Sequence, residues 1–179
     1  MGNWDSPQNI VLIGFMGTGK SSVGKKLAQR LGLRLIDTDT EIESSTGLTI
    51  PEIFQRDGVV RFRSEESLVV KKAASWRGVV ISTGGGAVLN PENLAVLRRS
   101  GIIVTLTASP AVICARTIRK GNRPLLKDDN SPEKIQKLLA ERDYAYRQGD
   151  LIIDTSDKSL DEVVQTIIEF LEEKRYGKN

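Results

Sequence analysis

The chain has 179 residues, a length typical of one domain, and its 39% hydrophobic and 27% charged residues are typical of a globular protein. A formal net charge of +3 is too small to indicate nucleic acid as the main partner. The sequence has no histidine and one cysteine, Cys114, so it excludes a Ser-His-Asp triad, a histidine-bound metal ion and an internal disulfide.

No apolar run approaches the roughly 20 residues of a membrane-spanning helix, and residues 1–8 lack the features of a secretory signal. We therefore expect a cytoplasmic, monomeric protein that binds no membrane, with 1–8 as a flexible leader and 9–179 as a single domain. Gly2 and Ser6 match a myristoylation pattern, but the pattern is short and no second membrane signal follows, so we interpret the match as coincidence.

In chain order, short apolar runs alternate with helical patterns. The runs are continuously apolar, as in strands buried on both faces of a parallel sheet, and they cover residues 9–15, 33–36, 79–82, 102–106 and 151–153. Cap residues followed by proline or glutamate mark the helix starts, at Thr49, Asn90, Ser109, Ser131 and Ser159. The alternation predicts an α/β fold of three layers, α/β/α, around a five-stranded parallel sheet.

The first strand leads into Gly14-Phe15-Met16-Gly17-Thr18-Gly19-Lys20-Ser21, which fits the phosphate-binding pattern G-x-x-x-x-G-K-[ST] in full. Glycines let backbone N–H groups surround a phosphate, and the helix that follows turns its positive end to the same anion. Lys20 is predicted to reach the β- and γ-phosphates of ATP and Ser21 to bind Mg²⁺. The rest of the predicted nucleotide set in this loop is Gly17, Thr18, Gly19 and Ser22.

Two carboxylates, Asp37 and Asp39, follow the second strand, at the sheet edge where ligands of α/β proteins bind. Because side chains two apart in an extended chain face the same way, both could point into one cleft. One carboxylate would contact the water shell of the metal ion and the other would contact a substrate hydroxyl. The alternative is that Asp39 only caps the next helix.

The third strand is followed by three glycines, Gly84, Gly85 and Gly86. Without side chains, they expose backbone N–H and C=O groups to a group that approaches closely; the alternative is that they form only a tight turn.

Two arginines are placed where a charge is costly. Arg142 lies on the apolar stripe of its helix with Ile135 and Tyr146, so it needs an anionic partner unless it turns outward to solvent. Arg63 lies at the edge of a second stripe, three residues from Glu66, and the two could form a purely structural pair. Residues 119–130 lack periodicity and are predicted to form a mobile lid.

The chain resembles the shikimate kinases, a family of small P-loop kinases, from about residue 9 to 170. The motifs that carry the resemblance are GFMGTGKS, DTDTEIE, TGLTIPEIF, DGVVRFRSEE, GGGAV, RPLL at 123–126 and AERDYAYR. It implies a substrate-binding helical segment at about 38–66, Mg²⁺ held with the help of Asp37, and Asp39 as the proposed base. It also implies that Arg123 of the lid acts on the transferring phosphate, with Arg116 and the 155–157 loop, Ser156 included, near adenine. The implied shikimate site contains Arg63 and Arg142 at the carboxylate, the backbone of Gly84–Gly86, and apolar walls from Phe54 and Phe62.

The resemblance implies transfer of phosphate from ATP to the 3-hydroxyl of shikimate, in the route to aromatic amino acids. One alternative is another P-loop kinase acting on gluconate or a nucleotide, which would not need two carboxylate-directed arginines beside three glycines. A nucleotide-binding module without phosphotransfer is the other. The GTPase strings N-K-x-D and D-x-x-G are absent from the sequence, whereas Lys20, Asp39 and Arg142 are all retained.

Overall fold

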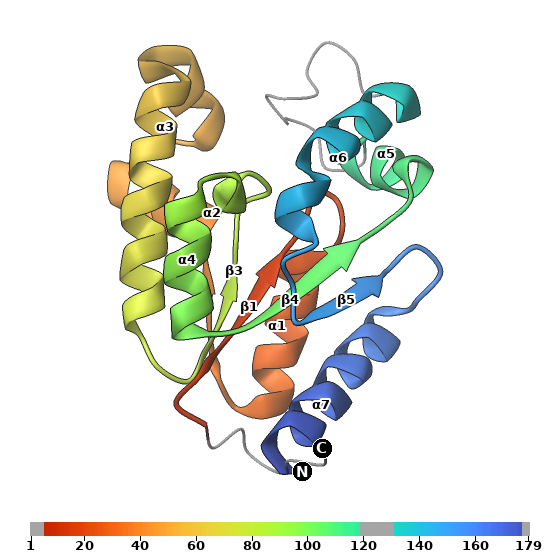
Figure 1. Ribbon diagram of the computed structural model, residues 1–179. Helices are drawn as coiled ribbons and strands as arrows, with labels where there is room; N and C mark the ends of the chain where they lie inside the picture. Colours follow the sequence, from red (N-terminus) through yellow and green to blue (C-terminus); the bar gives the residue numbers. More distant parts are fainter. Residues whose placement is uncertain (1–5, 119–130, 177–179) are drawn as a thin grey trace.

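The computed structural model describes residues 6–118 and 131–176, so the predicted lid 119–130, with Arg123, and residues 1–5 of the leader lie outside the described residues. Five parallel strands form one sheet in the order β2-β3-β1-β4-β5 (Figure 1). The strands are β1 (Asn9–Ile13), β2 (Arg34–Asp37), β3 (Val79–Ser82), β4 (Gly101–Thr107) and β5 (Leu151–Asp154). The predicted five-stranded parallel sheet is confirmed, with ends shifted by one or two residues.

The helices begin where the cap residues predict them. Thr49 and Glu52 form a reciprocal capping box, and Gly32 ends the first helix in a left-handed conformation. The helices are α1 (Lys20–Leu31), α2 (Thr38–Thr46), α3 (Ile50–Ser75), α4 (Pro91–Ser100), α5 (Pro110–Ile118), α6 (Pro132–Tyr146) and α7 (Leu160–Tyr176), with the short helix η1 (Ala87–Leu89) after β3.

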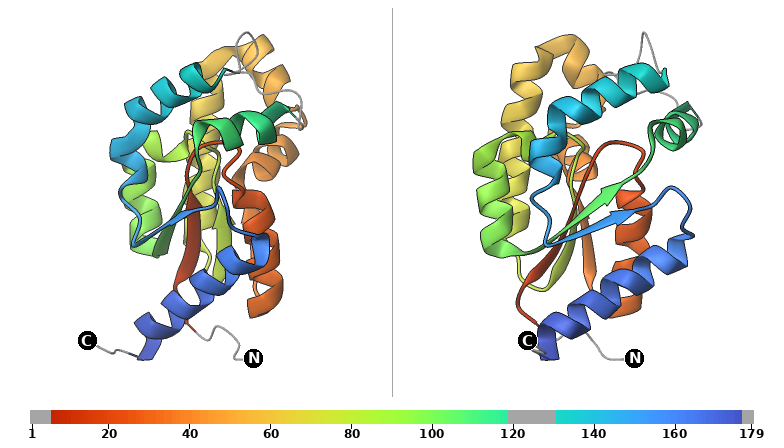
Figure 2. Two further views of the ribbon diagram at one scale, coloured as in Figure 1. Left: turned by 90° about the vertical axis from the view of Figure 1, so that its right-hand side faces the viewer. Right: turned by 45° about the vertical axis from the view of Figure 1, so that its right-hand side comes forward.

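Helices cover both faces of the sheet, which confirms the three layers (Figure 2). Alternate residues of β1 show how the core is divided. Val11 and Ile13 pack with residues of α3, α4 and α6, whereas Ile10 and Leu12 pack with residues of α1 and α7. The central strand is therefore buried on both sides, which is why its sequence is continuously apolar.

The segment after β2 differs from the expectation for an extended chain. Helix α2 begins at Thr38, directly after the strand, so Asp37 ends β2 and Asp39 lies in the first turn of the helix. Asp37, not Asp39, caps this helix: its side chain accepts hydrogen bonds from the Asp39 and Thr40 N–H groups. The argument that both carboxylates alternate along one extended chain is therefore wrong.

Helices α2 and α3 pack against each other through a small apolar cluster of Ile42, Ile53, Phe62 and Val69. Helix α3 is kinked at Gly58, whose φ of 79° lies in the left-handed region that glycine adopts without steric cost. The kink separates the capped start of α3 from the part that carries Phe62, Arg63 and Glu66.

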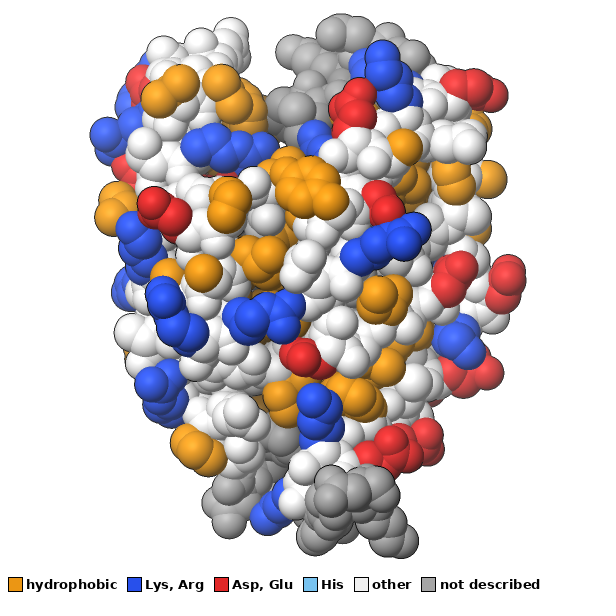
Figure 3. All heavy atoms as spheres, viewed as in Figure 1, with side chains coloured by type: hydrophobic (Ala, Val, Ile, Leu, Met, Phe, Trp, Pro, Cys, Tyr) orange, Lys and Arg blue, Asp and Glu red, His pale blue; other side chains and the backbone are white. Residues whose placement is uncertain are grey.

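The face seen in Figure 3 carries Lys and Arg side chains that lie apart from one another, with Asp and Glu side chains among them. This distribution agrees with the modest net charge and shows no single basic surface on that face. Among helices of the described ranges, none is both long and apolar enough to cross a bilayer.

Candidate active site

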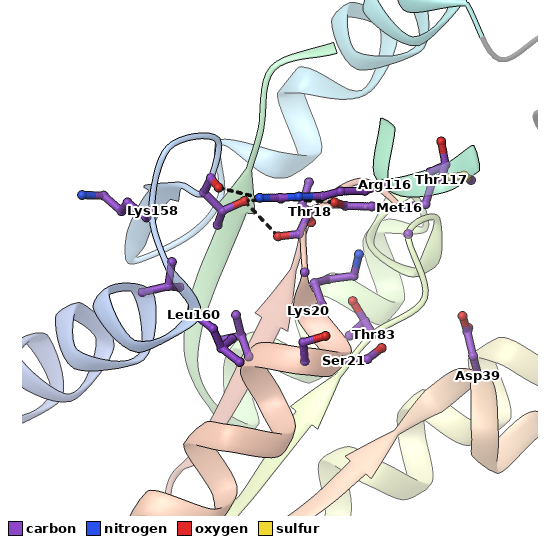
Figure 4. Close-up of a pocket in the computed structure, with 17 residues that line it drawn as sticks. Met16, Thr18, Lys20, Ser21, Asp39, Thr83, Arg116, Thr117, Lys158 and Leu160 are labelled. Atoms are coloured by element: carbon purple, nitrogen blue, oxygen red, sulfur yellow. Dashed lines mark hydrogen bonds between the residues drawn. The ribbon is translucent and has the colours of Figure 1, made fainter. Parts of the chain in front are cut away.

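A cavity of about 420 Å³ opens above the phosphate-binding loop, at the carboxyl ends of the strands (Figure 4). Residues from the loop, from α1 and from the segments after β3 and β5 line it. From the predicted nucleotide set, the lining includes Gly17, Thr18, Gly19, Lys20, Ser21, Ser22 and Arg116. The structure therefore brings together most of the residues that the sequence assigned to ATP, in a cavity of the size that small ligands occupy.

Lys20 holds the loop in shape from within. Its ammonium group donates hydrogen bonds of 2.8 Å to the carbonyl oxygens of both Gly14 and Phe15, and its side chain is buried. Gly14 must be glycine, because a Cβ there would lie 2.1 Å from the carbonyl oxygen of Leu106. The loop is thus built on the end of β4, with a positive charge at its centre.

Ser21 and Asp37 meet beside Lys20. The Ser21 hydroxyl donates a hydrogen bond of 2.8 Å to Asp37 Oδ2, while Asp37 Oδ1 accepts from the N–H groups that begin α2. A hydroxyl and a carboxylate are hard oxygen donors of the kind that Mg²⁺ prefers next to phosphates. The pair therefore fits the predicted magnesium position.

Asp39 lines the same cavity from the side of α2 (Figure 4). A Cβ at Gly84 would lie 2.6 Å from Asp39 Oδ1 and 3.1 Å from Glu66 Oε1, so the two carboxylates approach one glycine. Only a residue without a side chain fits between them.

All three glycines after β3 are needed for close approach, and none has a positive φ. A Cβ at Gly85 would lie 3.0 Å from the backbone nitrogen of Met16, in the phosphate-binding loop. At Gly86 it would lie 2.5 Å from both terminal nitrogens of Arg63. The triple glycine therefore touches the nucleotide loop on one side and Arg63 on the other, which argues against a simple tight turn.

Arg63 and Glu66 form the ion pair that their spacing predicts, with 2.5 Å between Nη1 and Oε2. Glu66 is buried, and among the described residues its other oxygen, Oε1, has no hydrogen-bond partner. Burial raises the pKa of Glu66 and the nearby Asp39 raises it further, against the opposing effect of Arg63. Glu66 thus holds Arg63 in place, and one third of the Arg63 side chain stays exposed.

Arg142 does not turn outward. Its guanidinium lies 5.4 Å from the ring centre of Phe15, and Nη1 is buried with no hydrogen-bond partner in residues 6–118 and 131–176. Burial raises the pKa of the Tyr146 hydroxyl, and the positive charges of Arg142 and Arg63 both lower it. The two arginines therefore converge near Tyr146, and Arg142 carries an unmet need for an anion.

The predicted apolar walls lie beside Arg63. The rings of Phe54 and Phe62 are in contact, with centroids 4.6 Å apart, and the Arg63 guanidinium lies 5.3 Å from the Phe62 ring centre. Phe54 and Phe62 flank the Gly58 kink, one on each part of α3.

The predicted adenine region is only partly assembled around the cavity. Arg116 donates to the Thr155 hydroxyl at 2.9 Å and to the Thr155 carbonyl at 2.8 Å (Figure 4). Thr155 lines the cavity, whereas Ser156 is absent from its lining; the Ser156 hydroxyl accepts from Ser109 N–H and donates to Asp154. Of the 155–157 loop that the resemblance placed near adenine, Thr155 lines this cavity, and the role of Ser156 stays a prediction.

Several residues of the site were not selected from sequence. Thr83, Lys158, Leu160 and Val163 line the cavity, and Tyr146 bonds to the triple glycine. Leu160 and Val163 belong to the apolar stripe of α7, which gives no sign that its first turn also faces a ligand. Tyr146 could have been found, because it lies one turn after Arg142 on the same stripe.

The parallel sheet and the lysine-centred phosphate loop, with two arginines beside a triple glycine, are features of a P-loop kinase of small molecules. The family model for shikimate kinase matches residues 16–172. The chain belongs to the shikimate kinase family.

Relatives and solved structures agree with this assignment. The shikimate kinase of Pelotomaculum thermopropionicum is 54% identical over 94% of this chain and 98% of its own length. The shikimate kinase of Desulforudis audaxviator is 50% identical over 94% of this chain and 89% of its own length. The structure of shikimate kinase from Acinetobacter baumannii in complex with shikimate is similar with a TM-score of 0.91 and 38% identity, over 95% of this chain and 96% of that one. A gluconokinase from Sinorhizobium meliloti, 21% identical with a TM-score of 0.59, shares only the fold.

Proposed function

We propose that the chain transfers the γ-phosphate of ATP to the 3-hydroxyl of shikimate, giving ADP and 3-phosphoshikimate for aromatic amino acid synthesis. The observation that carries the proposal is the buried, unpartnered Nη1 of Arg142, close to Arg63 and to the triple glycine. A planar carboxylate is the ligand that a guanidinium fork binds through two hydrogen bonds.

Each residue then has a role set by its place. Lys20 stabilises the charge on the transferring phosphate, and Asp39, across the cavity, orients the acceptor hydroxyl and takes its proton. A strong base is not needed, because the transition state of phosphoryl transfer is loose. Phe54 and Phe62 exclude water beside Arg63, and the backbone of Gly84–Gly86 contacts the acceptor. Arg123 remains a proposal from sequence.

Mg²⁺ would be held by the Ser21 hydroxyl and, through its water shell, by Asp37, whose contact of 2.8 Å brings both oxygens to one place. Bound there, the ion would neutralise charge on the phosphates. The nucleotide residues would be Gly17, Thr18, Gly19, Lys20, Ser21, Ser22 and Arg116, with Thr155 in addition to the proposed Ser156. A monomeric state and a cytoplasmic location stay predictions.

A panel of acceptors tests the proposal. ADP release from Mg-ATP should be fast with shikimate, weaker with quinate, and at background with gluconate and nucleotides. Phosphorus NMR of the product should show a phosphate ester on the ring. Faster turnover of gluconate or of a nucleotide would contradict the assignment, and ATP binding without turnover of any acceptor would favour a non-catalytic module.

A further inference from the structure

The hydroxyl of Tyr146 donates a short hydrogen bond of 2.6 Å to the carbonyl oxygen of Gly85. Tyr146 is 5% exposed, and two arginines lower the pKa of its hydroxyl against the effect of burial: Arg142 by its charge and a hydrogen-bonding interaction, and Arg63 by its charge. It lies at the end of α6, one turn after Arg142. This tyrosine therefore joins the helix that carries one substrate arginine to the backbone of the triple glycine.

The bond fixes more than one atom. A peptide unit is planar, and the described backbone has no cis bond, so the Gly85 C=O and the Gly86 N–H belong to one rigid plane and point in opposite directions. Between two glycines such a plane can turn over at small steric cost, because neither residue has a Cβ to oppose it. Holding the carbonyl toward Tyr146 therefore sets the direction of the Gly86 N–H.

The neighbouring groups are already held by others. The Gly84 N–H donates to the Thr38 hydroxyl at 2.9 Å, and the Ala87 carbonyl accepts from Asn93 at 3.0 Å. Within residues 6–118 and 131–176, the Gly86 N–H donates to no group of the protein. Gly86 itself lies against the guanidinium of Arg63. The amide that Tyr146 orients is thus an available donor beside the proposed acceptor site.

We infer that Tyr146 is a positioning residue: its hydroxyl locks the Gly85–Gly86 peptide so that the Gly86 N–H points at an oxygen of the acceptor. The inference rests on the proposed function and adds a residue to it. Tyr146 does not touch the reacting atoms; it acts through the peptide that it holds.

The test compares Tyr146→Phe, which keeps the ring and removes only the hydroxyl, with Tyr144→Phe on the same helix, whose ring is 60% exposed. In Tyr146→Phe the KM for shikimate should rise roughly five- to thirty-fold, the effect of one lost buried hydrogen bond, while the KM for ATP changes less than about two-fold. Tyr144→Phe should match the native protein in both constants. A merely structural role would move both KM values together, or neither.

Substrate analogues locate the effect. Shikimate amide and the 4-deoxy and 5-deoxy compounds each lose one interaction, and the ratio of kcat/KM for shikimate to that for the analogue measures the penalty. In Tyr146→Phe the penalty for one of the three should shrink while the other two stay as in the native protein. Unchanged penalties throughout would mean that the hydroxyl only supports packing, which would overturn the inference.

A measurement on the native protein does not depend on the variant folding. The amide signal of Gly86 should shift, and its exchange with solvent should slow, when shikimate is added. An unaffected Gly86 amide would overturn the inference. If the native protein phosphorylates shikimate and Tyr146→Phe has native kinetics, the inference alone is wrong. If the native protein does not phosphorylate shikimate, both the proposed function and the inference are wrong.

Discussion

Two charged side chains of this site have a buried polar atom without a partner among the described residues, and a third is held by the backbone of the phosphate loop. Arg142 has a buried nitrogen without a partner, Glu66 has a buried oxygen without one, and Lys20 places its ammonium on two backbone carbonyls. An unpaired buried polar group lowers stability, so its retention indicates a ligand or a shift in protonation. Three predictions follow from these three side chains.

Arg142→Ala should lower kcat/KM for shikimate by about thirty- to several-thousand-fold, the effect of ~2–5 kcal/mol from removing one side of a desolvated charge pair. Arg142→Lys should restore only part of it, since an ammonium lacks the planar two-point contact. Steady-state kinetics should show the KM for ATP unchanged. Shikimate amide, a poor substrate of the native protein, should lose much less on Arg142→Ala; equal discrimination by both proteins would make Arg142 structural.

Lys20→Ala should reduce kcat by at least about a hundred-fold, because the main protein cation at the transferring phosphate is lost. Circular dichroism should show an unchanged fold, since glycines form the turn of the loop. Lys25→Ala, which removes a lysine at an exposed position of the same helix outside the cavity lining, serves as the control and should retain native activity. Normal turnover by Lys20→Ala with saturating Mg-ATP would contradict the catalytic role.

Glu66 should make stability depend on pH. Burial raises its pKa above the ordinary value of 4.5, so the folded protein retains a proton that the unfolded chain has released. The contribution of Glu66 to the unfolding free energy is therefore complete below about pH 4.5 and declines as the pH rises through the folded-state pKa. Urea unfolding of the native protein and of Glu66→Gln should show their difference shifting in favour of the glutamine variant as the pH rises. A constant difference would contradict this assignment.

At the scale of elements, the site is built from the segments that follow three strands: the phosphate loop after β1, the carboxylate turn after β2 and the triple glycine after β3. The Gly84 N–H donates to the Thr38 hydroxyl, and Gly85 packs on the backbone of Met16, so the three segments are in direct contact. Because strands β2, β3 and β1 are neighbours in the sheet, their carboxyl ends must meet at one edge.

Gly86→Ala tests how tightly these ends fit. The new methyl group would lie 2.5 Å from the Arg63 guanidinium, which must shift away from its place beside Glu66. A displaced guanidinium no longer lies at its place in the proposed acceptor site, so kcat/KM for shikimate should fall roughly five- to a hundred-fold, the equivalent of about 1–3 kcal/mol of transition-state binding. Gly47→Ala, where a Cβ would meet no atom within 4 Å but φ is +70°, controls for a loss of stability without a clash at the site. Equal kinetics for the two variants would show that the Gly86 position has room to spare.

For the whole molecule, sequence reasoning predicts the layers, the strands and the helix starts, because buried runs and cap residues act locally. It also predicts the inward direction of Arg142 from a single helical stripe. It fails in the backbone conformation between Asp37 and Asp39, because whether a chain stays extended or turns into a helix after a strand depends on what the turn packs against. The stripe places Tyr146 beside Arg142, but the partner of its hydroxyl, Gly85, lies 61 residues away in the chain and could not be predicted from sequence.

Gly85 lines the nucleotide cavity and packs on the loop that would hold the phosphates, while its carbonyl is held by the helix that carries Arg142. Gly85 thus lies between the two sites and faces them through different atoms, its Cα toward the phosphate loop and its carbonyl toward Tyr146. Thermodynamic linkage then requires reciprocity: whatever factor ATP applies to the affinity for shikimate, shikimate must apply to the affinity for ATP. The two ligands of this small domain are consequently expected to bind as a coupled pair, with neither affinity defined without stating the concentration of the other.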